Sequence, residues 1–455
     1  MPRAIETQSK DRVCARAVLA TTALLVSLAV ASTTLLPLRA LADEPVRVEV
    51  VKTGSGWHLA RDGKPYFIKG VGGTGSKALL VQLGGNSFRT WGADRLTDDL
   101  ADAQNLGLTV TAGIWLGHRR QGFDYHNADQ VAAQLDKTRA IVRHFRNSPA
   151  LLIWAIGNEM ENDEPADDPA VWHAIEDIAA MIKQEDPNHP TMTVIAEVGN
   201  DKIPNLHRYC PHIDIVGINS YAGGESVGDR YRNAGGIKPY IITEFGPPGQ
   251  WEMEKKPWGG VRELTSTEKA DWYRRTYVHS VTGQPGLCLG SYAFNWGFKR
   301  EATATWYGMF LPDGSKVAAV DTISELWTGK PVTNPCPKIN SLKLAQGSGE
   351  YPTGAVVRAV LDTSSASGEP VTVTWELRRD AFQYQADAEG ASGASGFPEA
   401  ITRSRDNEVV LKMPNAGGGY RLYAYVRTPH NGSATANLSL YVDAPAPRPA
   451  PTKLQ

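Results

Sequence analysis

The feature that most constrains the fold is a regular alternation of short apolar runs with amphipathic stretches across residues 66–326. Such alternation is typical of βαβ units, in which parallel strands pair and helices cover the sheet. The strand candidates are residues 67–71, 87–91, 108–116, 151–159, 191–197, 213–221, 240–245 and 287–296. The helix candidates between and after them are residues 97–106, 129–146, 169–184, 266–280 and 320–326. The span is close to the roughly 250 residues of a (β/α)8 barrel, so we predict an α/β chain built on a TIM barrel.

The pattern changes after a Gly- and Pro-rich stretch at residues 329–337, which marks the end of the barrel domain, predicted over residues 43–330. Beyond it, alternating apolar and polar residues are separated by turn-rich gaps, and we predict a small C-terminal immunoglobulin-like β-sandwich over residues 338–443. Its strand candidates are residues 355–361, 371–377, 408–413, 420–426 and 436–442. An Ala-, Gly- and Ser-rich insert at 386–396 is expected to be a loose loop, and residues 444–455 a Pro-rich disordered tail.

The first residues have the composition of an export signal. A basic stretch precedes an apolar run at 17–30, and Ala40-Leu41-Ala42 forms an A-x-A cleavage site. We therefore expect residues 1–42 to be a signal peptide and the chain to be secreted or periplasmic. The alternative is a membrane anchor, although the uninterrupted apolar stretch is shorter than the ~20 residues that a span requires. Residues 43–66 are expected to close the bottom of the barrel as a β-hairpin.

Charge and cysteine content limit the partners of the chain. The 47 basic and 49 acidic residues leave a net charge of −2, which gives no electrostatic reason to expect nucleic acid or an anionic membrane as a partner. No cysteine has metal-ligand spacing, so we predict neither a metal nor a cofactor. In an oxidising compartment a Cys288–Cys336 disulfide is expected near the bottom of the barrel. The oligomeric state stays open.

Two of the predicted strands end in glutamate. One reads Leu-Leu-Ile-Trp-Ala-Ile-Gly-Asn-Glu and ends at Glu159, and the other reads Tyr-Ile-Ile-Thr-Glu-Phe-Gly and contains Glu244. Burial of a carboxylate beside an apolar strand costs free energy, which favours a functional role for a glutamate at such a position. These are strands 4 and 7 of the barrel, so both side chains are expected at the mouth formed by the carboxyl ends of the strands. A carboxyl pair facing across a site is what cleavage of a glycosidic bond needs.

The motifs around the two glutamates resemble those of retaining clan A glycoside hydrolases, especially the catalytic barrels of families 2 and 5. The resemblance covers roughly residues 66–327 and implies a β-glycoside hydrolase that cleaves β-linked glycans, such as β-glucan or a related poly- or oligosaccharide, by double displacement. It makes Glu159 the acid/base and Glu244 the nucleophile, with carboxyls about 5–5.5 Å apart. Family 2 enzymes usually carry sandwich domains ahead of the barrel, whereas here the predicted sandwich follows it.

The resemblance also implies roles for other residues near the strand ends. Arg89 would keep the nucleophile ionised, Asn158 would bind the sugar 2-hydroxyl, and Tyr221 would donate to the Glu244 carboxylate. Trp296 would stack beneath the sugar, and His118 would contact substrate hydroxyls.

Each of these residues also has a structural alternative. Arg89 could pair with Asp94, Tyr221 and Trp296 could simply pack, and Glu197, which also ends a strand, is interpreted as a structural or substrate-contacting group. Other tryptophans that could form sugar-binding walls or pack in the core are Trp91, Trp115, Trp251, Trp258 and Trp306.

Three other functions are compatible with parts of the sequence. A β-glucan transglycosylase would use the same glutamates, and a non-catalytic sugar binder would use the sandwich. The segment from Gly70 to Gly75 fits G-x-G-x-x-G with Asp94 about 20 residues further on, which would suit a nicotinamide-dependent oxidoreductase. Against that function, the helix candidate that follows is short and Lys69 lies in the strand, so we interpret these glycines as the first βα loop at the barrel mouth.

Overall fold

The computed structural model describes residues 44–164, 168–365, 368–380 and 396–443. The expected signal peptide and Pro-rich tail lie outside these residues, as does nearly all of the insert at 386–396.

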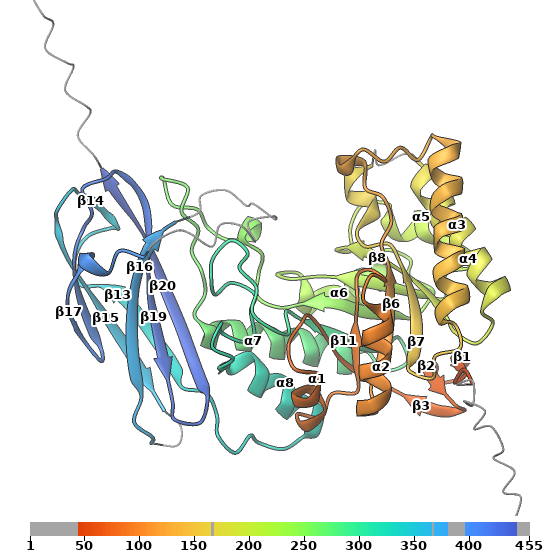
Figure 1. The fold of residues 1–455 in the computed structure, drawn as a ribbon, viewed down its shortest axis with the longest axis horizontal. Coiled ribbons are helices and arrows are strands. Elements are labelled where there is room, and N and C mark those ends of the chain that lie inside the picture. Colours follow the sequence, from red (N-terminus) through yellow and green to blue (C-terminus); the bar gives the residue numbers. More distant parts are fainter. Residues whose placement is uncertain (1–43, 165–167, 366–367, 381–395, 444–455) are drawn as a thin grey trace, which may run out of the picture. The chain divides into compact units, whose positions relative to one another are not determined.

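Eight parallel strands close into a barrel in the order β10-β11-β4-β5-β6-β7-β8-β9, which confirms the TIM barrel prediction (Figure 1). Each strand falls within, or within one residue of, a run predicted from the sequence. The strands are β4 Ile68–Gly72, β5 Ser87–Arg89, β6 Thr109–Ile114, β7 Leu151–Ile156, β8 Thr191–Ala196, β9 Ile215–Asn219, β10 Tyr240–Phe245 and β11 Cys288–Phe294. They are buried along nearly their whole length because helices cover the barrel from outside.

The helices that cover the barrel include all five that the sequence predicted. They are α1 Lys77–Gln82, α2 Leu96–Leu106, α3 Ala128–Phe145, α4 Ala170–Glu185, α5 Lys202–Tyr209, α6 Val227–Asn233, α7 Ser266–Thr276 and α8 Ala318–Thr328, with a π-helical turn at Tyr277–Thr282 after α7. Local signals set the ends: Thr265 and Glu268 form a capping box at the start of α7, and Gly107 ends α2 in the left-handed conformation. The three shortest helices, α1, α5 and α6, were not predicted.

The bottom of the barrel is closed by a three-stranded antiparallel sheet of β1 Val48–Thr53, β2 Gly56–Arg61 and β3 Lys64–Tyr66. Backbone hydrogen bonds join it to the loops that precede β8 and β11, from Val48 N to Asn188 O at 2.8 Å and from Trp57 N to Gly286 O at 2.7 Å. Val48 and Leu59 pack into a cluster with residues of the barrel strands. The expected hairpin is therefore present, with a third strand, and it leaves only the opposite end of the barrel open for a site.

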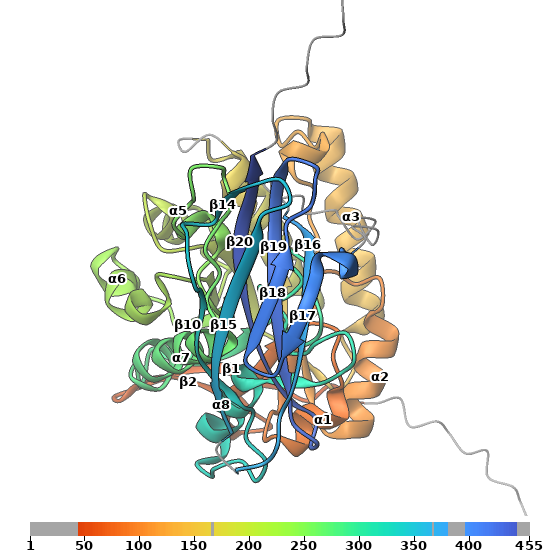
Figure 2. The ribbon, with the colours of Figure 1, turned by 90° about the vertical axis from the view of Figure 1, so that its left-hand side faces the viewer.

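The C-terminal part contains two sheets, seen as separate layers in Figure 1 and overlapping, one in front of the other, in Figure 2. One has the order β13-β15-β18-β17 and the other β12-β20-β19-β16, with β14 also paired to β20. The bounds are β12 Lys316–Val317, β13 Lys338–Leu344, β14 Glu350–Pro352, β15 Val356–Ser364, β16 Thr372–Arg379, β17 Ile401–Arg405, β18 Glu408–Lys412, β19 Gly418–Arg427 and β20 Gly432–Asp443. Side chains from both layers share one apolar core, so the sheets form a sandwich. The sequence predicted β15, β16, β18, β19 and β20 and missed the shorter or more polar strands.

The expected Cys288–Cys336 disulfide is wrong, because all three cysteines in the described residues are free and buried. The Cys288 thiol donates to Gly290 O and the Cys336 thiol to Lys316 O, both at 3.3 Å, so each is satisfied by a nearby carbonyl. Burial raises the pKa of the Cys288 thiol to about 12.

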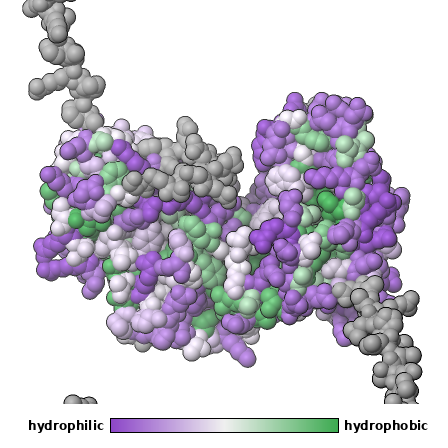
Figure 3. Space-filling model, in the orientation of Figure 1, coloured by the Kyte–Doolittle hydropathy of each residue, from purple (hydrophilic) through white to green (hydrophobic). Residues whose placement is uncertain are grey.

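The outer surface is mainly polar. Hydrophilic residues predominate on the face shown in Figure 3, and hydrophobic ones form small separate groups. Among the helices of the described residues, none has the length and apolar character needed to cross a membrane.

Candidate active site

A cavity of about 560 Å³ lies at the carboxyl ends of the barrel strands. Its wall contains Glu159, Glu244, Asn158 and Tyr221, four of the residues that the sequence singled out. Arg89 lies against this wall through its contacts with Glu244 and Asn158, whereas His118 and Trp296 are not part of the wall. A volume of this size is within the range of ligand-binding clefts.

Glu244, in β10, receives hydrogen bonds from three side chains. Trp91 Nε1 donates to Oε1 at 2.7 Å and Tyr221 Oη donates to Oε2 at 2.8 Å. Arg89 Nη1 lies 3.3 Å from Oε1, so the pair is also a salt bridge. The carboxylate is 6% exposed. Donors aimed at a buried carboxylate stabilise its charged form.

The donors to Glu244 are themselves buried and held in place. Burial lowers the pKa of the Arg89 guanidinium, and Glu244 is the largest influence that opposes this shift. Arg89 also donates to Thr243 O at 2.9 Å and Asn158 Oδ1 at 3.0 Å, rather than pairing with Asp94. Burial, reinforced by Glu244, raises the pKa of Tyr221 well above its usual value, so the phenol keeps the proton that it donates.

Glu159 lies in a different environment at the end of β7. Its backbone is left-handed, with φ of 55°, which turns the side chain toward the cavity wall. Asn219 Nδ2, at the end of β9, donates to Glu159 Oε1 at 2.7 Å. Burial, with a further contribution from the negative charge of Glu244, raises the Glu159 pKa to about 7, against the opposing effect of the Asn219 hydrogen bond. The two carboxyls of one cavity thus differ in their surroundings: Glu244 accepts from three side chains, one of them a guanidinium, whereas Glu159 accepts from the neutral amide of Asn219.

The expectation that Trp296 forms a stacking platform is wrong. Trp296 is 1% exposed, its ring packs edge-on against Phe310, and its Nε1 donates to Ser76 O at 3.1 Å. Phe294, two residues earlier, lines the cavity instead and contacts Trp91 and Tyr221 edge-on. Strand β11 ends at Phe294, so the chain turns there and carries Trp296 beneath the first βα loop.

Close packing against β11 and the residues that follow it explains the glycines at 70–75. A Cβ on Gly73, whose φ is +144°, would lie 2.3 Å from Trp296 O, and one on Gly70 would lie 2.3 Å from the Tyr292 ring. The backbones also bond directly, from Gly75 N to Trp296 O at 2.7 Å. These contacts require glycine for close approach, without any bound dinucleotide.

His118 and Glu197 both occupy positions that limit their roles. His118 is 1% exposed and lies behind Trp115, with the ring centroids 5.0 Å apart, so it does not contact substrate hydroxyls directly as expected. Glu197 lines the cavity, pairs with Arg230 at 2.7 Å and accepts a hydrogen bond from Ser220 Oγ at 2.6 Å. Its carboxylate therefore holds Arg230 and Ser220 in place at the cavity wall.

The five other tryptophans that the sequence singled out divide into three groups. Trp91 binds Glu244, and Trp115 and Trp251 line the cavity. Trp306 is buried with its Nε1 on Pro248 O at 2.9 Å, and Trp258 donates to Ser439 Oγ of the sandwich at 3.0 Å. Core or junction packing thus explains two of the five.

Sequence reasoning missed the contacts that Trp91 and Asn219 make with the glutamates. Asn219 is the last residue of a buried strand, and the argument that singled out Glu159 and Glu244 applies equally to this amide. Trp91 follows β5 beyond Arg89, and nothing in its local sequence distinguishes it from a core tryptophan. Within the described ranges, no group of three or more His, Cys, Asp or Glu side chains is placed to hold a metal ion.

Comparison with known proteins gives the class of the barrel. Residues 99–280 match the family model described as "Glycosyl hydrolases family 2, TIM barrel domain". The matched segment is less than half of the chain, and it is similar to the catalytic barrel of family 2 glycoside hydrolases. The carboxyl pair at the barrel mouth agrees with that similarity. A comparison with curated proteins finds no significant match.

Solved structures with a similar fold include three sugar-acid glycosidases. A β-D-glucuronidase of Dictyoglomus thermophilum is 17% identical, with a TM-score of 0.48, over 63% of this chain and 54% of its own. A β-glucuronidase 2 of Bacteroides uniformis is 14% identical, with a TM-score of 0.47, over 87% and 48%. A β-galacturonidase of Eisenbergiella tayi is 19% identical, with a TM-score of 0.47, over 63% and 54%. The matched region thus spans about half the length of these proteins.

Proposed function

We propose that this chain is a retaining β-glycoside hydrolase that cleaves β-linked glycans, with Glu159 as the acid/base and Glu244 as the nucleophile. The observation that carries the proposal is the contrast between two carboxyls in one cavity. Glu244 accepts from Arg89, Trp91 and Tyr221, whereas Glu159 has a pKa of about 7. Double displacement needs one carboxylate that attacks and one carboxylic acid that donates a proton.

In the first step Glu159 gives its proton to the glycosidic oxygen while a Glu244 oxygen bonds to the anomeric carbon. The bond between that carbon and the leaving oxygen breaks, which leaves a covalent glycosyl ester on Glu244. In the second step Glu159, now a carboxylate, removes a proton from water, and the water oxygen attacks the anomeric carbon and displaces Glu244. Two inversions give a product with the configuration of the substrate.

Neighbouring groups prepare these steps. Asn158 Oδ1 accepts from Arg89 and Asn219, so its amide N–H is the group left to donate to the sugar 2-hydroxyl, a bond that strengthens in the transition state. Phe294, at the cavity wall, contacts Trp91 and Tyr221 edge-on and helps to hold these two donors to Glu244 in place. Transfer to a second sugar in place of water would use the same groups and defines the alternative transglycosylase activity.

The sequence carries two further proposals about the whole protein. The basic and apolar leader with its A-x-A site supports removal of residues 1–42 on export, which would place the enzyme in the periplasm or outside the cell. The alternating strand pattern and shared core of the C-terminal sheets support an immunoglobulin-like module.

Nucleophile rescue tests the assignment. Glu159→Ala and Glu244→Ala should each lower turnover of an activated aryl β-glycoside by several orders of magnitude. Azide should then yield a β-glycosyl azide with the Glu159 variant and an α-glycosyl azide with the Glu244 variant. Glu49→Gln, on the exposed β1 strand at the far end of the barrel, is the matched control and should keep normal turnover. Normal turnover in either cavity variant would overturn the proposal.

A further inference from the structure

Two exposed tryptophans flank the candidate catalytic pair. Trp115 directly follows β6 and is 44% exposed, and Trp251 lies in the short helical turn Gln250–Glu252 after β10 and is 58% exposed. Both line the cavity that contains Glu159 and Glu244. Strands β6 and β10 are four positions apart in the ring of eight, so the two rings come from opposite sides of the mouth.

Both rings are held in place although they face solvent. Trp251 contacts Tyr221 edge-on at 6.0 Å, and a Cβ on Gly249 would come within 2.5 Å of its ring. Trp115 lies against buried His118. A large apolar ring left in water is unfavourable, and a ligand that covers it removes that unfavourable contact with water. A ring that is fixed before binding loses little entropy when a ligand covers it. The C–H face of a pyranose ring is a flat apolar surface that suits such platforms.

The charged groups of the wall disfavour sugars that carry a carboxylate. The ionisable residues that line the cavity are Glu159, Glu197, Glu244, Glu252, Glu301, Arg120 and Lys299. Lys299 pairs with Glu301 at 2.6 Å, and Glu197 pairs with Arg230 at 2.7 Å. Arg89 is held by Glu244 in the same way, so a carboxylate on the substrate would have to compete with a carboxylate of the protein for each of these three cations.

On the basis of the proposed glycosidase function, we infer that the cavity takes a neutral β-linked glycan chain that runs across the mouth over both Trp115 and Trp251. Sugars are then bound on each side of the cleavage point, and bonds inside the chain are cleaved. Trp115 adjoins the Glu159 side, because β6 and β7 are neighbours, and therefore contacts the leaving part of the chain.

The dependence of product size and KM on the length of the glycan substrate tests this inference with the full protein. With a neutral β-glucan or β-mannan we expect early products of intermediate size, and with a β-linked polyuronate little cleavage. Trp115→Ala and Trp251→Ala should each raise KM for a hexasaccharide about tenfold, equivalent to ~1.4 kcal/mol, with a smaller rise for a disaccharide. Trp→Phe should restore most of the affinity. Ile237→Ala, a 67% exposed residue on the turn before β10, is the control.

Release of single sugars from chain ends, preference for the polyuronate, or a KM change independent of chain length would overturn the inference. Failure of the proposed function is distinguishable, because Glu159→Ala and Glu244→Ala would then retain turnover of even the small aryl glycoside.

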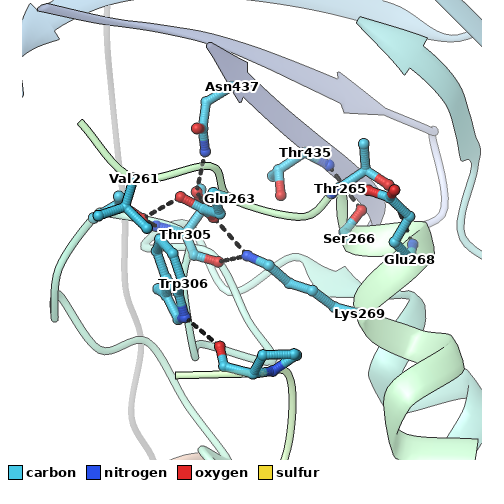
Figure 4. A network of polar contacts seen from close by, with 12 residues as sticks. Val261, Glu263, Thr265, Ser266, Glu268, Lys269, Thr305, Trp306, Thr435 and Asn437 are labelled. Carbon is cyan, nitrogen blue, oxygen red and sulfur yellow. Dashed lines mark hydrogen bonds and ion pairs between the residues drawn. The ribbon is translucent and has the colours of Figure 1, made fainter. Parts of the chain in front are cut away.

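A second, independent observation concerns the junction between the barrel and the sandwich (Figure 4). Buried Glu263 accepts from Lys269 Nζ at 2.5 Å and from Thr305 Oγ1 at 2.7 Å. Asn437, on β20 of the sandwich, donates to Thr305 Oγ1 at 3.3 Å. Arg421, on β19, donates to Asn437 Oδ1 at 2.6 Å and to Val261 O at 2.9 Å. The sandwich thus forms hydrogen bonds with the loop that follows β10 and with the loop that follows β11.

Those two loops continue into the cavity wall. Next to Thr305, Trp306 donates to Pro248 O, and Tyr307 Oη donates to Gln250 Oε1 at 2.9 Å. Tyr307 lines the cavity and contacts Tyr221, the donor to Glu244, with ring centroids 5.6 Å apart. We infer that the sandwich positions the Glu244 side of the site through Asn437 and Thr305, which are positioning residues because neither lies in the cavity wall.

A comparison of kcat with thermal stability tests this role. Thr305→Val and Asn437→Ala should lower kcat about fivefold with little change in KM, and Thr305→Ser, which keeps the hydroxyl, should restore most of kcat. Asn340→Ala, which removes an exposed contact with Asp362 on the outer sheet, is the control for the sandwich. A lower melting temperature with unchanged kcat in the valine and alanine variants would show a purely structural role and overturn the inference.

Discussion

Removal of the Asn219 side chain should move the pH dependence of the enzyme in a defined direction. Asn219 Nδ2 donates to Glu159 Oε1 at 2.7 Å, and this bond favours the carboxylate over the carboxylic acid. A hydrogen bond to a charged group contributes about 1.5–3 kcal/mol, and one pKa unit corresponds to about 1.36 kcal/mol. Asn219→Ala should therefore raise the Glu159 pKa by about one to two units.

The pH profile of kcat/KM reports this shift, because Glu159 must be protonated to donate to the leaving oxygen. The wild-type alkaline limb should lie near pH 7, in line with the Glu159 pKa of about 7. The Asn219→Ala limb should lie between about pH 8 and pH 9, even if the maximum rate falls. Asn233→Ala, an exposed change at the end of α6, should leave the limb in place. A limb that stays near pH 7 or moves to lower pH would refute the role given to Glu159.

Three further predictions follow from the same contacts. Trp91→Phe removes the 2.7 Å hydrogen bond to Glu244 and should lower kcat/KM by about one to two orders of magnitude in steady-state assays. Because the folded-state pKa of Glu159 is raised, the folded protein binds more protons than the unfolded chain between the two pKa values, and stability falls as pH rises toward 7. Glu159→Gln should therefore raise the melting temperature more at pH 8 than at pH 5, and an equal gain at both pH values would contradict this. Arg421→Met leaves buried Asp380 unpaired and should reduce the free energy of unfolding by about 3–5 kcal/mol, which denaturant titration can measure, whereas Arg421→Met with Asp380→Leu should recover much of the loss.

The barrel was predictable from the sequence because a parallel sheet buried on both faces leaves continuous apolar runs, and each of the eight was long enough to recognise. The positions of Glu159 and Glu244 followed from the rule that strand ends meet at the mouth, whereas Arg89 and Tyr221 were singled out by the resemblance to clan A glycoside hydrolases. Strands such as β14 and β17 were missed because three to five largely exposed residues carry little periodicity.

The wrong or missed predictions about the site concern residues at or near the ends of strands. Phe294 and Trp296 are two aromatic residues in one short motif, and only the point at which β11 ends decides which ring faces the cavity. The hydrogen bond between Trp91 and Glu244 joins residues 153 positions apart, and no local pattern reveals it. The glycines at 70–75 fitted a nucleotide motif because close approach to Trp296 demands the same residue as close approach to a phosphate.

The central claim is double displacement by Glu159 and Glu244, and the anomeric form of the first product tests it most directly. Proton NMR of a β-glycoside during the first moments of hydrolysis distinguishes the two anomers before they interconvert. We expect the β anomer to appear first and the α anomer only later, by mutarotation. First appearance of the α anomer would contradict it, because a single inversion leaves no covalent intermediate on Glu244.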